Sequence, residues 1–170
     1  MSGSAALIMM GRLWRRWRWW LAAVVVTGLG AAGYFLKPVT GPPRDLTLVG
    51  DVARGEYDIR LGGCDACHTD REHNGAYLAG GGPLTTPFGT FYPPNITSDK
   101  RTGIGGWTLA QFSDAISNGN GPEGNLYPVF PYNDLTLMSD QDVVDLYAAI
   151  MATPAVNHTA PANKVSFPLN

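Results

Sequence analysis

Cysteine is scarce in this 170-residue chain, which contains only two. Two cysteines exclude a second cysteine pair and a zinc site with four cysteine ligands. The chain also lacks internal repeats and strand-like alternation, so the cysteines do not have the βαβ context of a thioredoxin-like dithiol. A redox dithiol or half of a zinc site is thereby disfavoured. Helical patterns remain, and they predict an all-α fold with long loops.

Acidic side chains are absent from residues 1–36, which carry four arginines. The rest of the chain carries fourteen acids and eight bases. An acidic body of about six net negative charges argues against nucleic acid as a partner. The same charge suits docking to a basic protein surface, although solubility alone is a simpler explanation for it.

Residues 19–36 lack charge altogether. This run is just long enough to cross a bilayer core of about 30 Å. Tryptophans at its start, Tyr34 near its end and arginines before it fit a helix whose N-terminus is cytoplasmic. Residues 1–36 are therefore predicted to be a transmembrane anchor. The alternative is a cleaved signal peptide with a small-residue site near Gly30 to Gly33.

The pentapeptide Cys64-Asp65-Ala66-Cys67-His68 has the pattern Cys-x-x-Cys-His, the attachment signature of c-type haem. The two thiols add across the haem vinyl groups, and their spacing puts both sulfurs on one side of a short helical turn. His68 follows at once, so its imidazole is placed to bind iron as the proximal ligand. The sequence thus predicts one haem c, bound covalently through Cys64 and Cys67.

The remaining residues divide into three predicted parts. Residues 37–50 contain three prolines, which predicts a linker that lifts the next domain off the membrane. Residues 51–156 form the predicted haem domain, and residues 157–170 a tail that lies along a partner or the domain itself. Within the domain, residues 69–106 are rich in glycine and proline. Such a stretch builds no regular core of its own but could wrap a large apolar ligand such as haem.

Three main helices are predicted in the haem domain. The first begins near Asp51, and Gly55 lies on its apolar face, where a second helix could approach closely. The second follows Thr108, which begins a capping box, Thr-Leu-Ala-Gln. The third follows Ser139 and carries acidic residues in its first turn, where the helix dipole favours them.

A haem iron bound by one histidine leaves a sixth position. Met138 lies in a loop before the last helix, far enough from His68 for the chain to reach the other face of the ring, and it is the predicted sixth ligand. Met151 is explained by packing, and His158 is a weaker alternative ligand. Trp107 either donates its indole N–H to a haem propionate or packs in the core.

Five stretches together carry a resemblance: Cys64–His68 and residues 86–90, 95–97, 102–107 and 127–132. Over about residues 50–156 the chain resembles the class I cytochrome c modules in cytochrome subunits of membrane-bound bacterial alcohol, aldehyde and sugar-acid dehydrogenases. The resemblance implies a class I cytochrome c fold, with three main helices and long loops around one covalent haem. Those subunits usually contain three modules, whereas this chain has one. Many have methionine within the Pro-x-x-Pro phrase, where this chain has Phe130.

The resulting functional prediction is a membrane-anchored monohaem cytochrome that transfers single electrons and is not itself an enzyme. Its donor would be a dehydrogenase or a quinol-oxidising complex, and its acceptor an oxidase or another cytochrome. The predicted location is the bacterial inner membrane, crossed once, with the haem domain in the periplasm. The alternatives are a haem protein whose open sixth site binds gases or peroxide, and a structural haem subunit of a larger redox complex.

Overall fold

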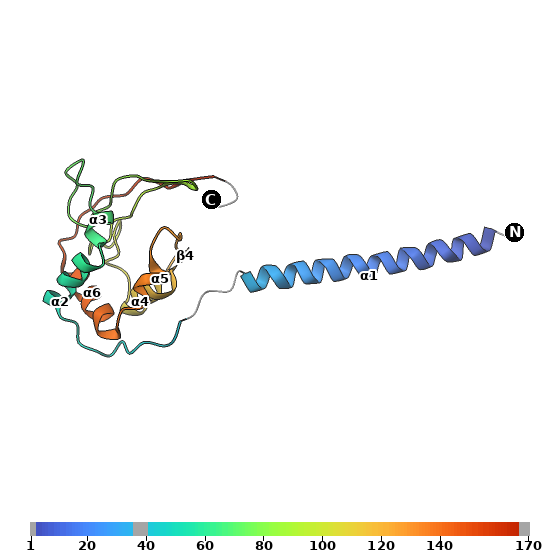
Figure 1. The fold of residues 1–170 in the computed structure, drawn as a ribbon, viewed down its shortest axis with the longest axis horizontal. Coiled ribbons are helices and arrows are strands. Elements are labelled where there is room, and N and C mark those ends of the chain that lie inside the picture. Colours follow the sequence, from blue (N-terminus) through green and yellow to red (C-terminus); the bar gives the residue numbers. More distant parts are fainter. Residues whose placement is uncertain (1–2, 36–40, 167–170) are drawn as a thin grey trace. The chain divides into compact units, whose positions relative to one another are not determined.

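The computed structural model describes residues 3–35 and 41–166. The chain divides into two compact units, residues 1–38 and 39–170, and each is described by itself. Figure 1 shows the one long helix of the first unit and the folded domain of the second.

The first unit is the helix α1 (Gly3–Phe35), which is 33 residues long. Its uncharged part begins after Arg18 and, within the described helix, ends at Phe35. No helix in the described ranges is both long enough and apolar enough to cross a membrane. The predicted transmembrane helix is therefore not confirmed, and its last residue, Leu36, lies outside the described residues.

Helices predominate in the described part of the second unit, and its strands are few and short. The helices are α2 (Val52–Leu61), α3 (Cys64–His68), α4 (Leu109–Asn118), α5 (Tyr132–Leu135) and α6 (Asp140–Ala152). The strands are β1 (Leu84–Thr86), β2 (Gly89–Phe91), β3 (Asn120–Gly121), β4 (Gly124–Asn125) and β5 (Lys164–Val165). The three longest helices, α2, α4 and α6, lie where the sequence predicts its three main helices.

The strands are a departure from the all-α prediction. Antiparallel β1, β2 and β5 form one small sheet, in which Leu84 pairs with Phe91 and Gly89 with Val165. Strands of two or three residues are too short to show the alternation by which strands are recognised in a sequence. Because β5 belongs to the C-terminal tail, the tail lies along the domain itself, which was one of the two predicted possibilities.

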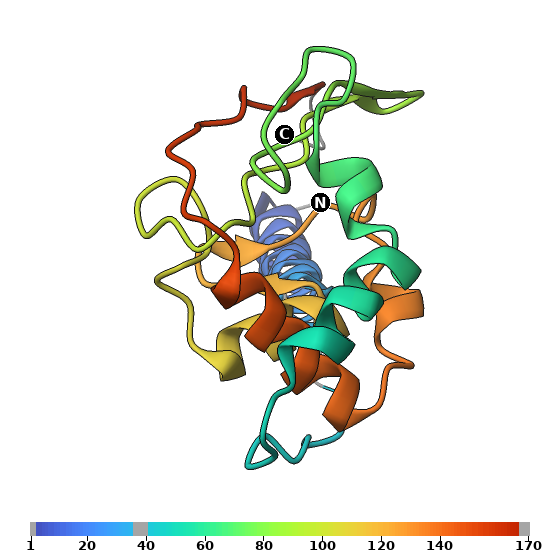
Figure 2. The same ribbon diagram turned by 90° about the vertical axis from the view of Figure 1, so that its left-hand side faces the viewer.

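The close approach predicted at Gly55 occurs between α2 and α6, which lie side by side in Figure 2. A Cβ atom at Gly55 would lie only 2.0 Å from the backbone oxygen of Asp145, so no larger residue fits. The two helices and α4 enclose a buried group of apolar side chains, called here the core cluster. Its members are Ile59, Leu78, Ile104, Phe112, Ile116, Val143, Leu146, Ala149 and Ile150.

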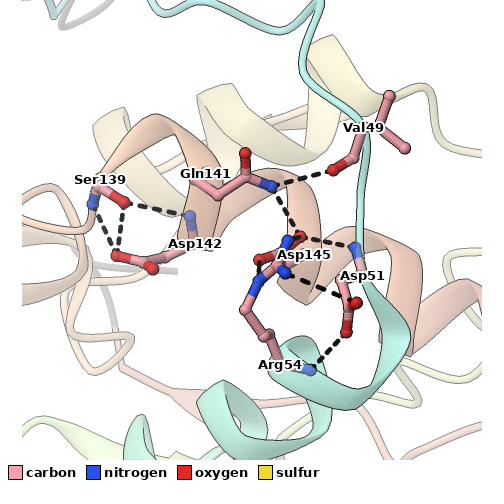
Figure 3. Close-up of polar contacts among 7 residues, drawn as sticks. All are labelled: Val49, Asp51, Arg54, Ser139, Gln141, Asp142 and Asp145. Atoms are coloured by element: carbon pink, nitrogen blue, oxygen red, sulfur yellow. Dashed lines mark hydrogen bonds and ion pairs between the residues drawn. The ribbon is translucent and has the colours of Figure 1, made fainter.

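A buried carboxylate links the start of α2 to α6 (Figure 3). The Asp145 side chain is 1% exposed and accepts hydrogen bonds from Arg54 Nε at 2.6 Å and from the Asp51 N–H at 2.6 Å. The Arg54 guanidinium holds the pKa of Asp145 below its ordinary value. Gln141 donates both to Asp145 and to the Val49 carbonyl, so residues just before α2 are bound to the domain.

The starts of α4 and α6 are capped by side chains. The capping box predicted at Thr108 is confirmed, because Thr108 and Gln111 exchange side-chain and backbone hydrogen bonds. Ser139 and Asp142 form a second capping box at the start of α6, which Figure 3 also shows. Capping of this kind is typically worth about 1 kcal/mol, and at Ser139 it fixes the residue directly after Met138.

Candidate functional site

The cysteine-containing turn begins at a glycine with left-handed backbone geometry. Gly63 has a φ of 66° and separates α2 from α3, which is the short helical turn that the sequence predicts. Both thiols are free, with Cys64 half-buried and Cys67 exposed. Cys64 packs against the core cluster, and burial raises the pKa of its thiol to about 11. The turn therefore presents the half-buried sulfur of Cys64 and the exposed sulfur of Cys67, and both are available for thioether bonds.

His68, the last residue of α3, is held in one tautomer by a loop. Its Nδ1 lies 2.7 Å from the carbonyl oxygen of Pro94. Since a carbonyl only accepts hydrogen bonds, Nδ1 carries the proton and Nε2 keeps its lone pair. Desolvation lowers the pKa of His68, which favours the neutral imidazole. A neutral imidazole oriented through its other nitrogen is the arrangement of a metal-ligating histidine.

The glycine-rich stretch after the turn packs directly on its backbone. A Cβ atom at Gly81 would lie 1.7 Å from the Cys67 carbonyl oxygen, a contact that only glycine permits. The Gly80 N–H donates to the His68 carbonyl at 2.9 Å, and the Gly81 N–H donates to the Pro93 carbonyl at 3.0 Å. These bonds connect the turn to the loop that holds His68. The glycine-rich stretch is thus fitted closely to the backbone of the predicted attachment site.

Trp107 and Met138 are half-buried, and both pack against the core cluster that Cys64 also contacts. The Trp107 carbonyl accepts a hydrogen bond from Tyr147 Oη at 2.8 Å. Phe130 packs against the same cluster, where it supplies apolar surface and cannot ligate iron. The structure therefore gathers three predicted site residues around one core, while His68 is fixed by the Pro94 loop.

Met151, which the sequence assigns to packing, and His158, the alternative ligand, lie in different surroundings. Met151, at the end of α6, packs against the core cluster. His158 lines a cavity of about 480 Å³ together with Asp70 and His73, which pair with each other at 2.9 Å. The backbone carbonyl of His158 accepts from Asn95 at 3.1 Å, so the tail is held at this point.

The side chains present fit a haem that is bound through thioethers. They are two free thiols on one turn, a neutral imidazole with Nε2 available, and a methionine sulfur on a half-buried loop. An imidazole and a thioether are two of the axial ligands that proteins use for haem iron. Of the described side chains, no group of three or more His, Cys, Asp or Glu could hold a separate metal ion.

Sequence reasoning missed two residues that hold this region together. The first is Pro94, whose carbonyl orients His68, and the second is Arg44, whose guanidinium binds the Met138 carbonyl. A backbone carbonyl has no sequence signature. Arg44 lies in the segment predicted to be a linker, where a single positive charge gives no indication of its partners 90 or more residues away.

No protein-family model matches the chain. Several curated proteins are nevertheless clearly similar to it. A diheme cytochrome c-type protein of Cereibacter sphaeroides is 40% identical over 156 residues, which are 88% of this chain and 52% of that protein. The gluconate 2-dehydrogenase cytochrome c subunit of Pantoea cypripedii is 45% identical over 116 residues, which are 68% of this chain and 25% of that subunit.

A third relative is the fructose dehydrogenase cytochrome subunit of Gluconobacter japonicus. It is 40% identical over 121 residues, which are 70% of this chain and 25% of that subunit. The chain thus spans about half the length of the diheme protein and about a quarter of the two dehydrogenase subunits. These similarities confirm the resemblance drawn from the five sequence stretches.

Proposed function

Because the chain is a c-type cytochrome related to the cytochrome c subunits of bacterial dehydrogenases, we propose that it transfers single electrons through one covalently bound haem c. Haem c would supply a reversible one-electron couple at this site. The observation that carries the proposal is the orientation of His68, whose Nδ1 donates to Pro94 and whose Nε2 is left for iron. Cys64 and Cys67 would hold the porphyrin edge on the same turn.

In this proposal Met138 occupies the sixth position. A thioether is a soft, neutral donor that favours ferrous over ferric iron and so raises the reduction potential. The half-buried position of Met138 supports this role, as does the capping box that fixes Ser139 next to it. With both axial positions filled by side chains, the protein would pass electrons and would leave no position for a gas or peroxide.

The rest of the domain would insulate the haem and present it to partners. The core cluster would keep water from one side of the site. Trp107 packs against that cluster, and its indole N–H would donate a hydrogen bond to a propionate. The acidic surface would dock to a basic partner surface. We propose a dehydrogenase or a quinol-oxidising complex as the donor, and an oxidase or another cytochrome as the acceptor.

The oxidised protein's absorption spectrum tests this function. Ferric haem with histidine and methionine ligands gives a weak charge-transfer band near the red end of the visible spectrum. We expect the purified, haem-loaded chain to show this band and to lose it on reduction. A ferric protein without the band, which bound added cyanide or azide at once, would instead have an open site and would act as a ligand binder.

We further propose that the first unit attaches the haem domain to the periplasmic face of the inner membrane. The exposed tryptophans Trp17, Trp19 and Trp20, with the arginines of the same helix, support contact with a lipid interface. The full chain should therefore sediment with membranes. A chain that begins at residue 39 behind a cleavable signal should be soluble with the same spectrum. A full chain that stays in the supernatant together with the shortened one would refute the proposed attachment.

A further inference from the structure

Arg44 is a nearly buried arginine in the segment that precedes α2. Its side chain is 11% exposed, whereas that of Arg54 is 57% exposed. Nη1 of Arg44 donates to the Met138 carbonyl at 2.8 Å, and Nη2 donates to the Thr136 carbonyl at 2.8 Å. One planar guanidinium thus binds two carbonyls of the loop that carries the predicted sixth ligand.

The same guanidinium also reaches the ends of two helices. Nε of Arg44 donates to Ser117 Oγ at 2.8 Å near the end of α4, and Nη1 donates to Asp140 Oδ1 at 3.0 Å at the start of α6. The Asp45 N–H adds a bond of 2.8 Å to the second oxygen of Asp140. The loop between α5 and α6 is therefore fixed by a segment more than 90 residues earlier in the chain.

These bonds constrain the backbone on which Met138 is carried. The guanidinium binds the carbonyls of Met138 and Thr136, and Ser139 caps the helix on the C-terminal side. The Met138 N–H donates to the Leu135 carbonyl, which closes the turn from the other side. A charged donor that is nearly buried is costly to leave unpaired, so the folded domain strongly favours this arrangement.

From this geometry we infer that Arg44 is a positioning residue that keeps the Met138 thioether in place as the sixth ligand. The inference rests on the proposed function, in which Met138 binds iron. Groups that orient a metal ligand without touching the metal commonly tune its affinity by tenfold to a hundredfold. The segment before α2 then does more than lead into that helix, because it sets how firmly the sixth position is closed.

The test compares Arg44→Ala with Arg54→Ala in the full haem-loaded chain. Arg54→Ala is the matched control, because it also removes a guanidinium bound to an aspartate and leaves Asp145 buried without its ion pair. We expect exchange of the Leu137 and Met138 amides to be at least about tenfold faster in Arg44→Ala than in the control. We also expect Arg44→Ala alone to weaken the methionine–iron band and to bind carbon monoxide at least about tenfold more tightly than wild type.

Arg44→Lys is the variant to measure if Arg44→Ala does not fold. Lysine keeps the charge but lacks the planar fork that binds two carbonyls at once, so the same changes should appear in weaker form. Equal band intensity, carbon monoxide affinity and loop exchange in the Arg44 and Arg54 variants would overturn the inference. Faster loop exchange with an unchanged band would overturn it too. Met138→Ala, measured alongside, separates the two claims, because retention of the band in that variant refutes the ligand assignment itself.

Discussion

Replacing Cys64 and Cys67 together by alanine should yield an exported chain that has neither covalent haem nor a stable fold. The loops that follow the turn have little regular structure, and they are held by contacts with the turn itself, such as the bond from Gly80 to the His68 carbonyl. Cys64 also packs against the core cluster. Without haem those loops would surround an unfilled apolar site, which a domain of marginal stability cannot tolerate. Haem staining of a denaturing gel and limited proteolysis would measure both effects.

Met151→Ala is the matched control for the cysteine variant. Its side chain packs against the same core cluster but has no part in the proposed attachment. Truncating a buried methionine costs about 2–5 kcal/mol, and this half-buried one should cost no more. We expect the Met151 variant to retain covalent haem and to unfold at a lower temperature. A cysteine double variant that stays folded and resists protease as well as Met151→Ala would refute the claim that haem completes the domain's core.

Met138→Ala should open the sixth position of the iron and lower the reduction potential. Removing the soft sulfur ligand takes away a preference for ferrous iron. A tenfold loss of that preference corresponds to a shift of about 59 mV for a one-electron couple, and we expect a shift of at least this size. The methionine–iron band should disappear, and the ferrous variant should bind carbon monoxide. Optical redox titration under argon measures the potential and the band, and titration of the reduced variant with carbon monoxide measures the binding.

Two variants serve as controls for Met138. Met151→Ala should keep the band and the wild-type potential, because its side chain only packs against the core cluster. His158→Ala should also keep them, since His158 lines a cavity with Asp70 and His73. If either control loses the band while Met138→Ala keeps it, the assignment of the sixth ligand is wrong.

Local patterns made much of the fold predictable. The Cys-x-x-Cys-His turn, the capping box at Thr108 and the start of the last helix after Ser139 each lie within a few residues of sequence, and all are found in the structure. Gly55 was recognisable because a glycine on the apolar face of a helix permits a close crossing, and α6 does cross there. Such features need no knowledge of distant parts of the chain.

Features that join distant residues could not be predicted in this way. Arg44 binds residues more than 90 positions later, and β5 pairs with β2 across more than 70 positions. Neither pairing leaves a periodic pattern in the sequence. The helix α1 shows a different limit. Its uncharged run is close to the length of a membrane span, yet no helix among the described residues is both long enough and apolar enough to cross a membrane.

In the candidate site, too, local patterns were predictable and contacts between distant residues were not. Cys64, Cys67 and His68 form one motif, and their chemistry follows from their spacing. The Pro94 carbonyl that orients His68 lies 26 residues away and is a backbone group, so only the structure identifies it. The distance of Met138 along the chain from His68 predicts it as the sixth ligand. The structure adds the reason for its fixed position, which is the set of bonds from Arg44 to its loop.

In the proposed function, His68 and Met138 would close both axial positions of one haem, and the chain would therefore carry electrons. Redox titration of the wild-type haem-loaded protein under argon and under carbon monoxide tests it directly. A closed site predicts a single one-electron transition with the same midpoint potential under both gases. Carbon monoxide binds ferrous haem wherever a position is open. A midpoint that rises under carbon monoxide would therefore contradict the claim and make the protein a ligand-binding haem protein.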